Sequence, residues 1–226
     1  MQNMKNLLAA IMVMAFAFGL MAEDKSAKNL LMAADTVVWA GLDYSMMRMV
    51  GTSNDIKVPD LIFQDMPQKW NDLFLDERLE GVANNMGKRV LIDIGAVSDR
   101  NRQLSTNQIV FTPDRKNSVS DVRVTEQDIT RALRSYKMEH TDGLGLVFII
   151  DSMVVQQFVP GSTHGGSTTA PSTANLEAVY VVFFDVATRE IISARREVSG
   201  VSVGSGYRNY WFGPIKNIDS ELGKYR

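Results

Sequence analysis

The sequence contains no cysteine, only two histidines and no strong excess of charge of either sign. Without cysteine the chain can form no disulfide, no thiolate metal site and no catalytic thiol, and it cannot carry a lipid on a cysteine. A net charge of −2 lacks the basic excess that is typical of nucleic-acid-binding surfaces. These absences exclude thiol chemistry and predict no nucleic-acid partner.

The two histidines fit no metal or catalytic motif. His140 follows an expected helix, and His164 lies in a segment rich in Gly, Ser and Thr. Neither belongs to a spacing such as His-Glu-x-x-His. The sequence therefore predicts no metal site, no catalytic residue and no cofactor.

One uncharged apolar run, Leu7–Met21, is too short to cross a membrane as a helix. It follows the positive charge of Lys5 and precedes the small Ala22 and the charged Glu23. This order is typical of a secretory signal peptide. We expect residues 1–22 to be removed, and residues 23–226 to form a single periplasmic or secreted domain without a transmembrane segment.

The rest of the chain alternates strand-like and helix-like patterns. Thr125 and Asp128 are spaced like a capping box that opens a helix, and Gly87 suits the end of an earlier helix. The three residues 187–189 between two apolar runs predict an antiparallel hairpin. Strands are expected at 36–50, 88–97, 144–159, 176–186 and 190–198, helices at 67–85, 126–139 and 207–225, and a polar connection at 98–120.

This order predicts an α/β sandwich with a mainly antiparallel sheet, a three-stranded meander near the C-terminus and a closing helix. Residues 161–173 combine Gly, Ser, Thr and Pro, which predicts a flexible insertion between two strands of the meander.

Three groups of residues are candidates for a site. The glycine cluster 200–206 precedes a helix and is either a plain loop or a small-ligand cradle, although it lacks a phosphate-loop ending. Each of four aspartates ends or interrupts an apolar run, where it satisfies turn amides or, with a second carboxylate, performs hydrolysis. These are Asp43, Asp93, Asp151 and Asp185, of which Asp43 and Asp185 are the proposed hydrolytic pair.

The third group is aromatic, with Tyr207, Tyr210, Trp211 and Phe212 beside Arg208. Such residues either pack in a core or anchor a protein interface. As binding residues we select Arg208, Tyr210 and Trp211.

The stretch Val182–Ser193 places an apolar strand, an aspartate and a Thr-Arg-Glu turn before a second apolar strand. It resembles a hairpin of the CsgG-like envelope proteins, which include penicillin-binding-protein activators, and the whole chain looks like exported proteins of Bacteroidota. The resemblance implies an α/β sandwich. The chain departs from that group because it has no lipid-anchoring cysteine.

We therefore expect a non-catalytic exported envelope protein that binds another envelope protein. A cell-envelope hydrolase and a small-ligand-binding protein are the alternatives, and self-association of the chain is left open.

Overall fold

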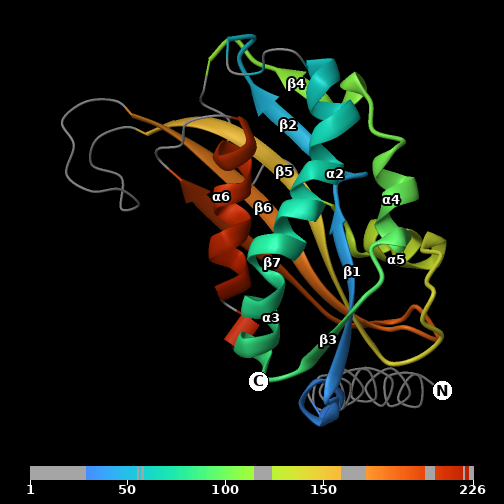
Figure 1. Cartoon of the computed structure of the whole chain (residues 1–226). Helices are drawn as coiled ribbons and strands as arrows, with labels where there is room; N and C mark the ends of the chain where they lie inside the picture. The colour runs from blue at the N-terminus through green and yellow to red at the C-terminus, as the bar shows by residue number, and fades with distance from the viewer. Residues whose placement is uncertain are drawn as a thin grey trace, which may run out of the picture.

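The computed structural model describes residues 29–54, 56, 59–114, 124–158, 172–201, 207–220 and 222–223. Within these ranges the chain forms one seven-stranded sheet with helices on both faces (Figure 1). The strands are β1 (Thr36–Asp43), β2 (Arg48–Gly51), β3 (Arg89–Ile92), β4 (Ile109–Phe111), β5 (Leu144–Phe158), β6 (Ser172–Asp185) and β7 (Ile191–Val201). The helices are α2 (Pro59–Glu77), α3 (Leu79–Met86), α4 (Gly95–Asn101), α5 (Glu126–Ser135) and α6 (Tyr207–Ser220), with a short 3₁₀ turn at Thr106–Gln108.

The long strand β5 organises the sheet. Along one edge it pairs antiparallel with β6, which pairs antiparallel with β7. Along its other edge lie β1 and then β2, one after the other and both parallel to β5. The outer strands β3 and β4 pair parallel with β1 and β2.

The expected mainly antiparallel sheet is therefore wrong, because β3, β1, β5, β2 and β4 are all parallel. The physical reason is the helical crossover. The chain leaves β1 and β2, passes through α2 and α3, and returns as β3 in the same direction, which is the usual way to join parallel strands. Only β5, β6 and β7 are joined as antiparallel neighbours.

Several element boundaries also differ from the predictions. The expected strand 36–50 is two strands, separated by residues 44–47. The helix expected at 67–85 is two helices, α2, which begins earlier at Pro59 and has Pro67 in its interior, and α3. The expected strand 88–97 ends at Ile92 and is followed by α4, and the connection 98–120 contains the short strand β4.

Other local predictions are confirmed. Thr125 accepts a hydrogen bond from the Asp128 N–H, and the Asp128 side chain bonds back to Thr125, so the capping box opens α5. Gly87 ends α3 in the left-handed conformation that glycine adopts without strain. The hairpin at residues 187–189 joins β6 and β7. Of the insertion 161–173, residues 161–171 lie outside the described part and residues 172–173 begin β6.

Each face of the sheet has its own hydrophobic core. The first lies under α2, α3 and α6 and contains the stacked rings of Trp39 and Phe74, whose centroids are 4.5 Å apart. The second lies under α4 and α5 and includes Val97, Leu133 and Phe184. Because β5 contributes residues to both cores, its near-continuous apolar sequence is explained by burial on both faces.

Gly145 in β5 lies under the ring of Phe184, its cross-strand partner. A Cβ atom at this position would stand 2.4 Å from the ring. We expect Gly145→Ala to lower the free energy of unfolding by about 1–3 kcal/mol through overpacking. Urea unfolding measures the loss. Gly95→Ala is the matched control, since no atom lies within 4 Å of its added Cβ, and an equal loss in both variants would contradict this packing account.

Candidate functional site

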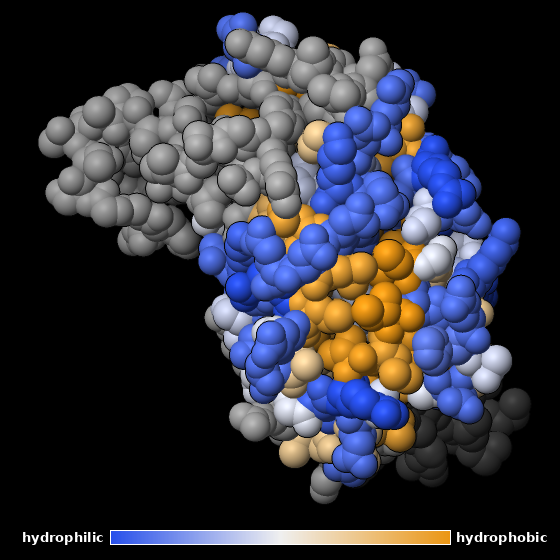
Figure 2. All heavy atoms as spheres, viewed as in Figure 1, coloured by the Kyte–Doolittle hydropathy of each residue, from blue (hydrophilic) through white to orange (hydrophobic). Residues whose placement is uncertain are grey.

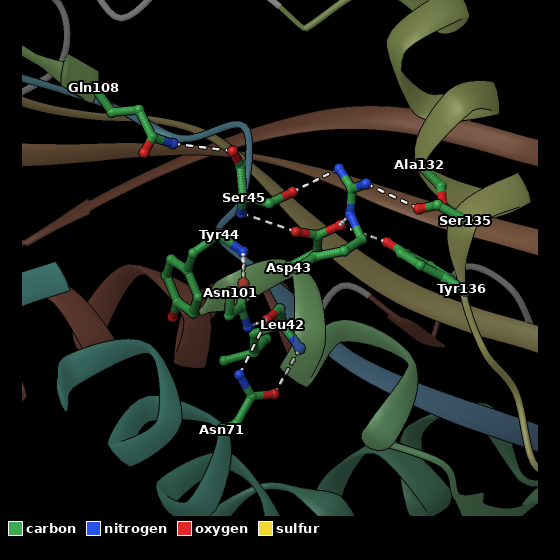
Figure 3. A network of polar contacts seen from close by, with 11 residues as sticks. Leu42, Asp43, Tyr44, Ser45, Asn71, Asn101, Gln108, Ala132, Ser135 and Tyr136 are labelled. Carbon is green, nitrogen blue, oxygen red and sulfur yellow. Dashed lines mark hydrogen bonds and ion pairs between the residues drawn. The ribbon is translucent and has the colours of Figure 1, made fainter. Parts of the chain in front are cut away.

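The break between β1 and β2 carries a buried polar network (Figure 3). Asp43 pairs with Ile149 and Arg48 pairs with Ser152. Between these two pairs the chain from β1 to β2 moves on by five residues, whereas β5 moves on by three. The extra residues leave the regular ladder, and their backbone groups need other partners.

Two asparagines from opposite faces of the sheet bond the backbone at the end of β1, at Leu42, and at the start of the break, at Tyr44. Asn71 of α2 accepts a hydrogen bond from the Leu42 N–H (2.8 Å) and donates to the Leu42 carbonyl (3.0 Å). Asn101 of α4 accepts from the Tyr44 N–H (2.7 Å) and donates to the same Leu42 carbonyl (2.9 Å). Gly41, at a φ of +110°, gives Asn71 room, because a Cβ there would lie 2.8 Å from the Asn71 Oδ1. The interrupted strand is therefore fixed by both helical layers.

Asp43 stands at the centre of this network and is fully buried. Its carboxylate accepts hydrogen bonds from Arg100 Nε (3.0 Å), the Tyr136 hydroxyl (2.7 Å) and the Ser45 N–H (2.8 Å). The other two guanidinium nitrogens of Arg100 donate to the hydroxyls of Ser135 and Ser45. Burial, and then the charge of Asp43, raises the pKa of Tyr136 well above its usual value. Tyr136 therefore stays a neutral donor to the carboxylate.

Two further buried aspartates hold the ends of the same helical region. Asp93 accepts the backbone N–H groups of Glu139 (2.8 Å) and His140 (3.0 Å), and its Oδ2 lies 3.1 Å from the His140 Nδ1. Asp151 of β5 lies 2.7 Å from Arg196 of β7 and accepts the Val124 N–H just before α5. Together with the Tyr136 bond to Asp43, these contacts tie both ends of α5 to the sheet.

The two carboxylates named for the hydrolase alternative, Asp43 and Asp185, do not converge. Asp43 lies beside Ile149 of β5 and Asp185 beside Leu144, five residues away. At about 3.3 Å per residue, this separates them by roughly 17 Å along the strand. Asp185 caps the β6–β7 hairpin by accepting the Thr188 N–H (2.7 Å).

In the part of the chain that the structure describes, no group of three or more His, Cys, Asp or Glu side chains could hold a metal ion.

Most of the other predicted site residues fall outside the description. Helix α6 includes Arg208, Tyr210 and Trp211, but the structure does not describe their side chains. Phe212 is buried, 6.5 Å from Phe74 in an edge-on ring contact. Of the glycine cluster, residues 200–201 end β7 and residues 202–206 lie outside the described residues, as does His164.

One buried acid was missed by the sequence analysis. Glu177 of β6 is fully buried, and neither carboxylate oxygen has a hydrogen-bond partner among the described residues. Burial raises its pKa well above the usual value. The nearby Tyr44 hydroxyl is also buried without a described partner, and burial and then Glu177 raise the Tyr44 pKa. The sequence indicates that Glu177 is buried, because it lies on the same face of the strand as Val179 and Val181, which belong to the first core.

The outer edge of β3 is uncovered by any strand that the structure describes. Beside it, Figure 2 shows an apolar area on the surface where Figure 1 draws α2, α3 and β3. The half-buried side chains of Leu75, Leu79 and Val90 lie on these elements, and Ile92 is 47% exposed. This edge combines open backbone hydrogen-bonding groups with apolar surface.

No protein-family model matches the chain, and no curated protein matches it. Three similar solved structures are a hypothetical protein of Chlamydia trachomatis, the lipoprotein GNA1162 of Neisseria meningitidis and a neuraminyllactose-binding hemagglutinin homologue of Helicobacter pylori. Their identities are 12%, 8% and 10%, and their TM-scores 0.36, 0.32 and 0.27. The matches cover 85%, 82% and 85% of this chain and 92%, 98% and 81% of the others.

At these TM-scores none of the likenesses establishes a fold or a function for this chain. The neighbours include one lipoprotein, and the CsgG-like resemblance stays a prediction. Among the described helices, none is both long and apolar enough to span a membrane.

The two buried tyrosines should respond differently to loss of their hydroxyls. Tyr136→Phe removes a donor from the Asp43 carboxylate, and we expect it to lower the free energy of unfolding by about 1.5–3 kcal/mol. Tyr44→Phe removes a buried hydroxyl with no described partner, so it should leave stability unchanged or raise it. Chemical denaturation measures both, and a larger loss in Tyr44→Phe would contradict the hydrogen-bond assignments.

Glu177 should make the protein less stable as pH rises. Its folded pKa is raised, so its neutral form favours the fold. That contribution is complete below the unfolded pKa of about 4.3 and is lost as pH rises towards the folded value. We expect the unfolding free energies of wild type and Glu177→Gln to diverge from pH 5 upward, with the variant gaining relative stability. A constant difference across this range would show that folding does not raise the pKa of Glu177.

Proposed function

We propose that the chain is a non-catalytic exported envelope protein that acts by binding another protein, and that the outer edge of β3 is its contact surface. The observation that carries this proposal is the uncovered edge itself. A strand at the edge of a sheet offers unpaired N–H and C=O groups to a second chain, and proteins usually cover or charge such edges. Here the edge has an exposed apolar residue, Ile92, beside half-buried apolar neighbours.

The use of the buried carboxylates supports binding over hydrolysis. Asp43, Asp93 and Asp151 each accept backbone or side-chain donors that fix α5 or its flanks. General acid–base catalysis needs a carboxyl group within reach of substrate. The Asp43 carboxylate is instead buried and accepts hydrogen bonds from Ser45, Arg100 and Tyr136. The resemblance of residues 182–193 to the CsgG-like envelope proteins points to the same class of function.

A photo-crosslinking amino acid at position 92, introduced into the full chain in cells that produce it, tests the contact surface. The matched control is position 198 on β7, because Val198 is also 47% exposed and lies on the opposite edge of the sheet. We expect a discrete protein adduct from position 92 and none from position 198. Equal crosslinking at both positions, or none at position 92, would contradict the assignment of the β3 edge.

The hydrolase alternative is tested on the same protein. If Asp43→Asn, in a folded variant, abolished a measurable cell-wall hydrolytic activity, the enzyme function would replace the binding function.

A further inference from the structure

We draw no further inference here: the strongest candidate, the buried side-chain pair of Glu177 on β6 and Tyr44 at the break between β1 and β2, rests on burial and raised pKa values alone, and nothing in the described part of the chain shows what it would bind.

Discussion

The structure depends on one constraint, which is that the long strand β5 must be paired along both edges. One edge is filled by the continuous strand β6, but the other is filled by two short strands, β1 and β2, with a gap between them. The chain leaves the ladder at that gap, so its backbone groups need other partners. Asn101 of α4 bonds the Tyr44 N–H there, and Asn101 and Asn71 of α2 both bond Leu42 at the end of β1, which joins both helical layers to the centre of the sheet.

The buried charges follow from the same constraint. Asp43 at the end of β1 is balanced by Arg100 and Tyr136, which brings the end of α5 onto the sheet beside α4. Asp93 and Asp151 fix the residues on either side of α5 in the same way. The polar residues that looked catalytic in the sequence therefore serve to assemble the fold. We propose that function lies at the surface, at the edge of β3.

The sequence predicted features that depend on neighbouring residues and missed those that depend on distant ones. The Thr125–Asp128 capping box, the Gly87 helix end and the hairpin at 187–189 are set by local hydrogen bonds and turn geometry. The parallel order was missed because β2 and β4 are only four and three residues long, too short for a periodic signal. The network around Asp43 joins residues up to 93 positions apart, which no local pattern reveals. Glu177 was also missed, although its buried position follows from the alternation of side chains along β6.

The central claim is that Asp43 and Arg100 act as structural partners, and a double-mutant cycle tests it most directly. Free energies of unfolding would be measured for wild type, Asp43→Asn, Arg100→Met and the double variant. The structure predicts that the double variant loses less stability than the two single variants together, with a coupling energy of about 1–3 kcal/mol, because the residues share one buried network. Strictly additive losses would contradict it, and would mean that the carboxylate at the strand break does not depend on its arginine.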